Sequence, residues 1–274
     1  MKFALSTNWC NRRIESGEAI ADKALELGFD GLELGFHTTQ AQVDGFKRRL
    51  DRIPVGSIHA FCPVPISAPQ GYPELYQLSA DDEDARAMAR FHVRRNIEFA
   101  AEMGADALVL HAGRVMCHGL LRRWDMKRRV GRGRKFIDIL KRELDQLVPV
   151  LEKNKVTLGL ENLPYLEGFP AEWELKEVVG EWVKPWFDTG HDFVRRTNGW
   201  IADALPMMEG AVGMHINDSV GGDDHLPPGA GKVNFSSLKA LALSARHLVF
   251  EPNPDVDEGA LKRGVEYLKG LWET

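Results

Sequence analysis

The 274-residue chain is poor in cysteine and has no long apolar run. Its three cysteines, Cys10, Cys62 and Cys117, cannot all pair and show no Cys-x-x-Cys spacing. We therefore expect a reduced, cytoplasmic protein without a disulfide framework. The first residues lack an extended apolar segment, and no run approaches the roughly 18 apolar residues of a membrane helix. These absences argue against secretion and against a membrane span.

The chain also lacks an excess of positive charge. Its formal net charge is −5 and its isoelectric point is about 6.0. These values argue against a protein whose whole surface binds nucleic acid, but they leave a local basic patch open. Phosphate-binding glycine loops of the Walker or dinucleotide type are absent, since Gly131-Arg132-Gly133 follows no predicted strand. With 44% hydrophobic and 27% charged residues, the composition is that of a globular protein with a sizeable core.

Strand-like and helix-like patterns alternate along the whole chain and form eight pairs. This alternation predicts a parallel sheet, and eight pairs in 274 residues favour a closed barrel over an open sheet. We expect residues 1–274 to form one (β/α)8 TIM-barrel domain with a metal site at the C-terminal ends of its strands. The expected strands are Lys2–Thr7, Gly31–Phe36, Val55–Phe61, Asp106–His111, Thr157–Leu163, Trp186–Asp188, Val212–Asn217 and His247–Glu251.

The segments between these strands supply the expected helices. The Pro- and Gly-rich stretch Pro63–Tyr72 follows the third strand and is expected to be an active-site loop instead. The expected helices are Glu18–Leu27, Gln40–Leu50, Asp82–Met103, Lys135–Lys153, one within Ala171–Glu181, Trp200–Glu209, Ser236–Leu243 and Asp257–Leu271.

Four successive strands end in a residue that can bind a metal ion. These four strand-end residues are Glu161, Asp188, His215 and Glu251. Each signal is weak alone, because a strand-end Glu can face solvent, an Asp can cap a helix and a strand His is often a hydrogen-bonded core residue. The series is harder to explain by chance. Carboxylate and imidazole without thiolate suit one divalent Mn, Mg, Co or Zn ion.

A second set of polar residues surrounds the four strand-end residues. Its members end a predicted strand, interrupt one or follow one in a loop: Glu33, His59, His111, His191, Asp223, Asp224 and His225. We expect them to contact substrate or to bind additional metal ions. For His59 and His111, a structural hydrogen-bonding role is an equal alternative. Glu33 interrupts an apolar strand and is expected to point into the barrel mouth.

Seven strings that contain these residues resemble a known superfamily. They are His59-Ala60, Leu110–Gly113, Leu160–Leu163, Asp188–His191, His215–Asp218, Asp224–Gly231 and Phe250-Glu251. Together, and in order over nearly the whole chain, they resemble the xylose-isomerase-like barrel superfamily. That group contains sugar and sugar-phosphate isomerases and epimerases, dehydratases and endonuclease IV. The resemblance is strong for the superfamily and weak for the reaction.

The isomerase and epimerase branch gives the leading hypothesis. This resemblance implies that the four strand-end residues hold one divalent ion and that His191 contacts substrate. It also implies that the ion stabilises an enediolate while Glu161 and Glu251 act as acid and base on opposite faces of the substrate. The expected activity is metal-dependent isomerisation or epimerisation of a sugar, sugar phosphate or related polyhydroxy compound.

Endonuclease IV gives the competing hypothesis, a phosphodiesterase with two or three zinc ions. Its pattern also matches His59, His111, His191, Asp223 and His225. The longer insertion with an Asp-Arg-His string that it carries after strand seven is absent here, which favours a small-molecule enzyme. A metal-dependent lyase or dehydratase on the same barrel is a third hypothesis.

A basic segment follows the fourth predicted strand. It has ten Lys and Arg residues between Arg122 and Arg142. They form either a solvated helix face or a region that captures a sugar phosphate, an acid or a DNA backbone. Thin aromatic content does not favour base stacking. The expected partner is a small polyol or sugar, with an anionic group left open. Nucleic acid is disfavoured but stays an alternative, no membrane is expected, and a homo-oligomer is also left open.

Overall fold

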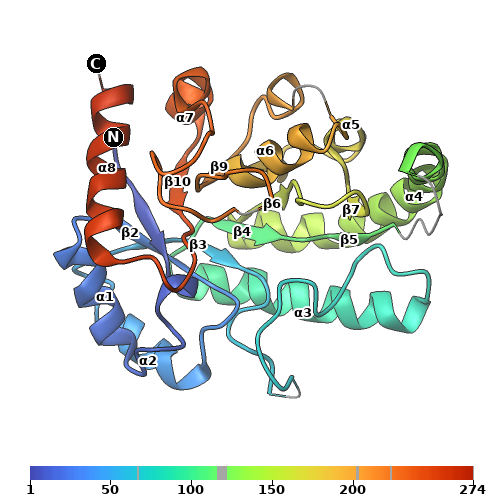
Figure 1. The fold of residues 1–274 in the computed structure, drawn as a ribbon. Coiled ribbons are helices and arrows are strands. Elements are labelled where there is room, and N and C mark those ends of the chain that lie inside the picture. Colours follow the sequence, from blue (N-terminus) through green and yellow to red (C-terminus); the bar gives the residue numbers. More distant parts are fainter. Residues whose placement is uncertain (67, 116–121, 202–203, 223, 274) are drawn as a thin grey trace.

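The eight strands of the barrel lie at the centre of the computed structural model, and the helices surround them (Figure 1). The structure describes residues 1–66, 68–115, 122–201, 204–222 and 224–273, without the side chains of residues 122–126. The barrel strands are β1 (Ala4–Ser6), β2 (Gly31–Leu34), β3 (Val55–His59), β4 (Ala107–Leu110), β6 (Thr157–Glu161), β8 (Val183–Asp188), β9 (Gly213–Ile216) and β10 (His247–Phe250).

All neighbouring strands of the barrel are parallel, and β1 pairs with both β2 and β10. The sheet is therefore closed, and the predicted (β/α)8 barrel is confirmed. Because the strands are parallel, their C-terminal ends meet at one mouth of the barrel. The register places Asp188 of β8 opposite His215 of β9, so these two side-chain positions lie level with each other.

The helices alternate with the barrel strands. They are α1 (Gly17–Glu26), α2 (Gln40–Lys47), α3 (Glu83–Glu102), α4 (Arg122–Asn154), α5 (Glu172–Leu175), α6 (Thr189–Thr197), α7 (Lys239–Ser244) and α8 (Glu258–Trp272). Short 3-10 turns cover Thr7–Trp9 (η1), Leu205–Met207 (η2) and Phe235–Leu238 (η3). None of these helices combines the length and apolar character needed to cross a bilayer.

Two helix predictions were wrong in their bounds. α4 begins at Arg122, not at Lys135, because the frequent basic residues of its first turns hid the apolar period of the helix. The predicted helix Trp200–Glu209 contains only the turn η2 among its described residues. The helix of this unit is α6, which starts at Thr189 because the Asp188 side chain caps it directly at the strand end.

Two short strands stand outside the barrel. β5 (Gly113–Arg114) follows β4, and β7 (Gly168–Phe169) follows β6. They pair antiparallel, with Arg114 opposite Gly168. Since both extend loops that leave C-terminal strand ends, this ribbon holds Arg114 beside the mouth of the barrel.

The interior of the barrel is filled by one tryptophan and small apolar side chains. Trp186 of β8 is fully buried, and its ring centroid lies 5.2 Å from that of His215. Gly159 and Gly213 lie on the strands that flank β8. A Cβ at Gly213 would lie 2.3 Å from the indole ring, and a Cβ at Gly159 would lie 2.9 Å from it. The two glycines therefore make room for the indole beneath the site.

Candidate active site

The predicted polar residues gather at the C-terminal end of the barrel. Seven of them lie in, or directly follow, barrel strands and are buried: Glu33, His59, His111, Glu161, Asp188, His215 and Glu251. His191 joins them from the first turn of α6, and His225 joins them from the loop after β9. Asp223 lies outside the described residues.

The four strand-end residues lie within reach of a single ion. One candidate ligand atom from each of Glu161, Asp188, His215 and Glu251 lies within 4.8 Å of the other three. His215 Nδ1 is 3.0 Å from Glu161 Oε1, 3.2 Å from Glu251 Oε2 and 3.9 Å from Asp188 Oδ2. One imidazole nitrogen therefore faces three carboxylates.

This arrangement fits a divalent cation. Three buried carboxylates in one place are costly unless a positive charge balances them. Oxygen donors with one imidazole, and no thiolate, are the donor set that Mn, Mg, Co and Zn accept. The cluster is therefore able to hold a metal ion.

Glu33 fixes the orientation of the His215 ring. His215 Nε2 lies 3.0 Å and 3.2 Å from the two Glu33 oxygens, and Ser57 Oγ donates to Glu33 Oε2 at 2.8 Å. A carboxylate accepts hydrogen, so Nε2 of His215 donates to Glu33, and Nδ1 is the ring nitrogen that faces the strand-end carboxylates. Glu33 thus lies behind His215 and is not among the residues that line the pocket, contrary to the expectation that it points into the mouth.

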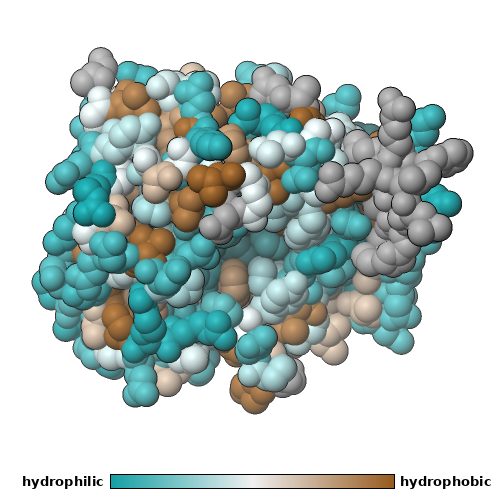
Figure 2. Space-filling view, in the orientation of Figure 1, coloured by the Kyte–Doolittle hydropathy of each residue, from teal (hydrophilic) through white to brown (hydrophobic). Residues whose placement is uncertain are grey.

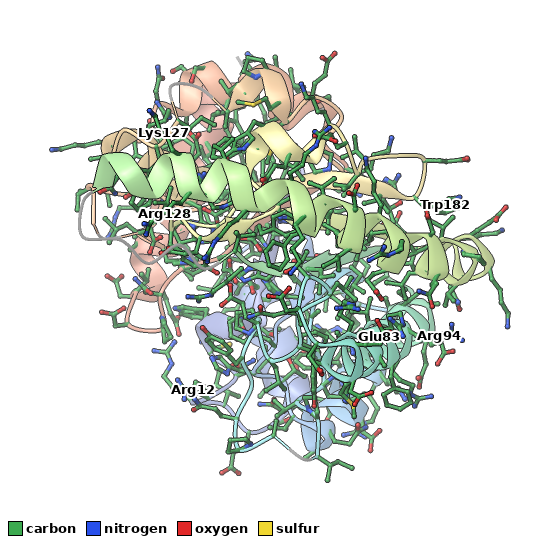
Figure 3. All side chains as sticks on the ribbon, turned by 90° about the vertical axis from the view of Figure 1, so that its right-hand side faces the viewer. Arg12, Glu83, Arg94, Lys127, Arg128 and Trp182 are labelled. Carbon is green, nitrogen blue, oxygen red and sulfur yellow. The ribbon has the colours of Figure 1, made fainter. Side chains whose placement is uncertain are left out.

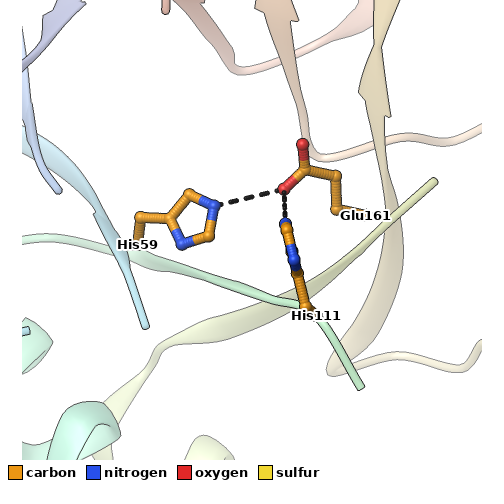
Figure 4. A group of neighbouring side chains, drawn as sticks. All are labelled: His59, His111 and Glu161. Carbon is orange, nitrogen blue, oxygen red and sulfur yellow. Dashed lines mark hydrogen bonds and ion pairs between the residues drawn. The ribbon is translucent and has the colours of Figure 1, made fainter. Parts of the chain in front are cut away.

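Glu161 is surrounded by imidazoles. His111 Nε2 and His59 Nε2 lie 3.0 Å and 3.3 Å from Glu161 Oε2, so both rings point at one oxygen (Figure 4). The other oxygen, Oε1, lies 3.0 Å from His215 Nδ1 and 3.4 Å from His191 Nδ1. The carboxylate therefore links the metal-binding group to the second set of histidines.

Three histidines share one orientation. His59 Nδ1 lies 3.0 Å from the carbonyl oxygen of Ala60, and His225 Nδ1 lies 2.8 Å from that of Glu251. His191 Nδ1 lies 2.9 Å from the carbonyl oxygen of Asn162. A carbonyl accepts hydrogen, so Nδ1 donates in each case. The second ring nitrogen, Nε2, is thereby directed into the site.

Asp188 combines two roles that the sequence left as alternatives. Its Oδ1 accepts from the backbone N–H of His191 at 2.7 Å, which caps α6. Its Oδ2 accepts from Asn217 Nδ2 at 2.8 Å and belongs to the metal-binding group. The cap fixes the carboxylate, so capping and ligation are compatible.

Burial and mutual charge set the pKa values of the site. Burial favours the neutral form of Glu161, but the imidazoles of His215 and His111 hold the pKa of this carboxyl well below its usual value. Burial also opposes the charge on His215, yet Glu251 and Glu33 raise its pKa well above 6.5. For Asp188, burial dominates and raises the pKa. Burial likewise lowers the pKa of His111. The cluster is thus a strongly interacting set of charges.

Further ligand groups stand beside the first. The described residues offer His59, His111 and Glu161 as one group and His191, Asp224 and His225 as another, each with ligand atoms within 4.8 Å. Asp224 Oδ2 lies 3.8 Å from His191 Nε2. Asp224, the neighbour of the predicted Asp223, therefore faces the site.

A pocket opens above these groups. Its cavity volume is about 240 Å³, and Glu161, His191, His225 and Glu251 form part of its lining. The molecule is hollowed near the middle of the face drawn in Figure 2. Tyr72, at the end of the predicted active-site loop, also lines the pocket.

A family model for the xylose isomerase-like TIM barrel matches residues 21–271. The chain belongs to this family. The fold is shared with a D-tagatose 3-epimerase-like protein (22% identity, 100% of this chain and 97% of that one, TM-score 0.71). It is also shared with the 3-keto-D-glucoside 4-epimerase of E. coli (18%, 98% and 99%, 0.74) and with a D-psicose 3-epimerase crystallised with D-fructose (15%, 100% and 100%, 0.71). No curated protein matches the chain.

The basic segment of this xylose isomerase-like barrel is engaged away from the pocket. Lys127 and Arg128 lie near the start of α4, which crosses the side of the molecule drawn in Figure 3. Arg129 is buried and donates to both oxygens of Glu174, at 2.8 Å and 2.7 Å. Lys135 pairs with Asp81 at 2.5 Å. None of the described side chains of residues 127–142 lines the pocket, so these interactions fit a structural and solvated helix.

Sequence reasoning missed several pocket residues. Asn8, Glu74, Arg114 and Tyr165 all line the pocket. They lie in loops, in a 3-10 turn or on the short β5, so no strand-end pattern marks them. For Arg114, the one usable signal was its position three residues after His111, in a loop that leaves a C-terminal strand end.

Proposed function

We propose that the protein is a divalent-metal-dependent isomerase or epimerase of a sugar or related polyhydroxy compound. The observation that carries the proposal is the convergence of Glu161, Asp188, His215 and Glu251 beneath a small pocket. The fold shared with proteins described as sugar epimerases adds support.

In this proposal the four strand-end residues hold one ion of Mn, Mg, Co or Zn. When bound, such an ion supplies Lewis-acid polarisation of a carbonyl oxygen and of the hydroxyl next to it. Glu33 keeps the lone pair of His215 Nδ1 directed at the ion position.

Glu161 and Glu251 are proposed to move the proton. Of the four strand-end residues, these two line the pocket, whereas Asp188 and His215 lie behind it. Burial acts against the ionised form of Glu251, but His215 and His225 keep its pKa below the usual value, so both groups are able to accept a proton. The ionised one removes a proton from the carbon beside the carbonyl, and the other, which must already be protonated, gives its proton to the opposite face of that carbon.

The histidines of the second set are proposed to orient the substrate. His191 and His225 line the pocket and present Nε2, since Nδ1 of each is held by a backbone carbonyl. This places Nε2 of each ring where it can hydrogen-bond to a sugar hydroxyl. His59 and His111 instead face Glu161 Oε2, where they position that carboxylate.

Replacing Glu161 with Gln tests the assignment. The amide keeps the shape of the side chain but removes the proton acceptor, so we expect exchange of the substrate C–H proton with D2O to fall by at least a thousandfold. Proton NMR of a ketose incubated with the Mn-loaded enzyme measures the exchange. Glu177→Gln, which removes a carboxylate paired with Arg134 at 3.2 Å, is the matched control. Full activity of Glu161→Gln would contradict the proposal.

A phosphodiesterase of the endonuclease IV type is the second candidate. One observation favours it: besides the four strand-end residues, the described residues offer three further ligand groups, two of which share members with those four. The cavity of about 240 Å³ argues for a small ligand instead. Elemental analysis separates the two, since one ion per chain supports the isomerase and three zinc ions per chain support the phosphodiesterase.

A further inference from the structure

One wall of the pocket carries an ion pair that the proposed reaction does not use. Arg114 Nε donates to Glu74 Oε2 at 2.5 Å, and Arg114 Nη2 contacts the same oxygen. Arg114 Nη2 also donates to the hydroxyl of Tyr72 at 3.2 Å, and this hydroxyl donates to Glu74 Oε2 at 3.3 Å. The guanidinium lies 4.1 Å from the ring centroid of Tyr165. Carboxylate, hydroxyl and aromatic face together hold the cation in place.

The second oxygen of Glu74 is left without a partner. Glu74 is only 6% exposed, and its Oε1 is buried with no hydrogen bond among the described residues. A buried carboxylate oxygen without a donor is costly and calls for an explanation. Because Glu74 also lines the pocket, this oxygen lacks a donor in a residue that stands beside the position of a ligand.

The charges of the pocket wall disfavour an anion. Among the described lining residues, Arg114 is the only Lys or Arg, and its charge is paired with Glu74. The other charged lining groups are the carboxylates of Glu161 and Glu251, and the imidazole of His225, which also lines the pocket, lies 3.9 Å from a Glu251 oxygen that balances any charge on it. A phosphate group is normally bound by unpaired cations or by a cluster of N–H donors. Here it would meet carboxylates and a guanidinium that is already engaged.

We propose that Tyr72, Glu74, Arg114 and Tyr165 form a hydroxyl-recognition subsite that selects uncharged polyhydroxy ligands over their phosphate esters. Glu74 Oε1 accepts a hydrogen bond from a ligand hydroxyl, while Arg114 holds the carboxylate and has its own charge cancelled by it. This proposal rests on the proposed function, because both assign the pocket to a polyhydroxy substrate. It adds that the substrate is unphosphorylated.

Calorimetric titration with sorbitol and sorbitol 6-phosphate tests the subsite. Neither compound has a carbonyl group, so binding to the Mn-loaded protein is measured without turnover. We expect the wild type to bind sorbitol at least tenfold more tightly than its phosphate. Equal affinity, a preference for the phosphate or no binding of sorbitol would overturn the proposal. A separate assay of ketose turnover tests the proposed function, so the two can fail independently.

Two substitutions should shift this selectivity in opposite ways. In Glu74→Gln the guanidinium loses its counter-charge, so binding of sorbitol 6-phosphate should improve at least tenfold while binding of sorbitol weakens. In Arg114→Gln the carboxylate is unpaired, so binding of the phosphate should weaken further. A general packing defect would weaken both ligands in both variants. That result, or unchanged selectivity in Glu74→Gln, would overturn the assignment.

The controls separate the subsite from net charge and from misfolding. Glu177→Gln removes the same charge from an ion pair outside this pocket, and its selectivity should equal that of the wild type. Tyr72 is 46% exposed, so Tyr72→Phe tests the subsite even if Glu74→Gln does not fold. Loss of its hydroxyl loosens the pair, and selectivity should fall two- to fivefold. Unchanged selectivity in a Tyr72→Phe protein would count against the proposal.

Discussion

The side chains of the site are oriented from behind, by groups that do not themselves face the pocket. Backbone carbonyls hold Nδ1 of His59, His191 and His225, and Glu33 holds Nε2 of His215. A ring that is fixed in this way presents a defined nitrogen to the ligand, and little conformational entropy is lost when the ligand binds. Residues outside the pocket should therefore affect binding as strongly as some residues within it.

Glu33→Gln should weaken metal binding. The amide lacks the negative charge that makes His215 a stronger ligand, and it can turn its NH2 toward the ring and reverse the tautomer. We expect the affinity for Mn to fall about 10- to 100-fold, measured by calorimetric titration of the metal-free protein. Ser57→Ala removes one hydrogen bond to Glu33 and should have a smaller effect. An unchanged affinity in Glu33→Gln would show that Glu33 does not orient the ligand.

His37 should make the protein sensitive to mild acid. Burial, with a smaller effect of Arg12, lowers the pKa of His37 to about 4, below the value near 6.5 of an unfolded chain. The unfolded state therefore binds more protons between pH 6.5 and 4. The contribution of neutral His37 to the free energy of unfolding is fully present above pH 6.5 and is lost as the pH falls toward 4.

The variant His37→Gln isolates this contribution. Urea unfolding with EDTA at pH 7.0 and at pH 5.0 should show a smaller loss of stability in the variant than in the wild type. Equal losses in the two proteins would mean that His37 is not held neutral in the folded state.

At the level of secondary structure, Asp188 joins a strand end, a helix start and the metal-binding group. Asn caps helices as well as Asp does, so Asp188→Asn should keep the stability of the metal-free protein within about 0.5 kcal/mol. Asp188→Ala loses the cap and should cost about 1 kcal/mol or more. Both should lose most of their affinity for the ion. Denaturant unfolding with EDTA and Mn titration measure the two effects separately, and equal stability of the two variants would argue against the capping role.

The proximity of the strand-end residues was predictable because the C-terminal ends of all strands in a parallel barrel meet at one mouth, independently of the loop conformations. The sequence alone therefore identified Glu161, His215 and Glu251 as neighbours, although they are far apart along the chain. Helix bounds were less predictable. From the sequence, Asp188 could either cap a following helix or bind a metal ion at its strand end. In the structure it caps α6 and also belongs to the metal-binding group.

Loop residues could not be predicted from periodicity. Glu74 is buried only because the loop after β3 folds back over the mouth and meets Arg114 of β5. This contact joins segments 40 residues apart, and neither has a pattern that specifies the other. The direction of Glu33 was misjudged for a related reason, since its partner His215 lies on a strand that is distant in sequence.

For the whole molecule, the metal-binding group joins four adjacent strands of the barrel's C-terminal half. Its members come from β6, β8, β9 and the end of β10, so an ion bound there binds the folded state alone. Mn at 100 times its dissociation constant should stabilise the fold by about 2.7 kcal/mol. For a chain of this length the melting temperature should then rise by roughly 5 °C or more. Thermal unfolding with Mn and with EDTA measures the shift, and Glu251→Gln should abolish most of it. A shift that survives in this variant would place the ion elsewhere.

The packing of the Trp186 indole beneath the site means that Trp186, Gly159 and Gly213 are expected to evolve together. Trp186 occupies the space that side chains at Gly159 and Gly213 would need, and it lies against His215. A methyl group at either glycine would displace the indole ring, so neither glycine can mutate first without disturbing the packing beneath the site. A smaller residue at position 186 must come first and leaves a cavity until a glycine is enlarged. Descendants of this chain are thus expected to keep all three residues or to have replaced them together.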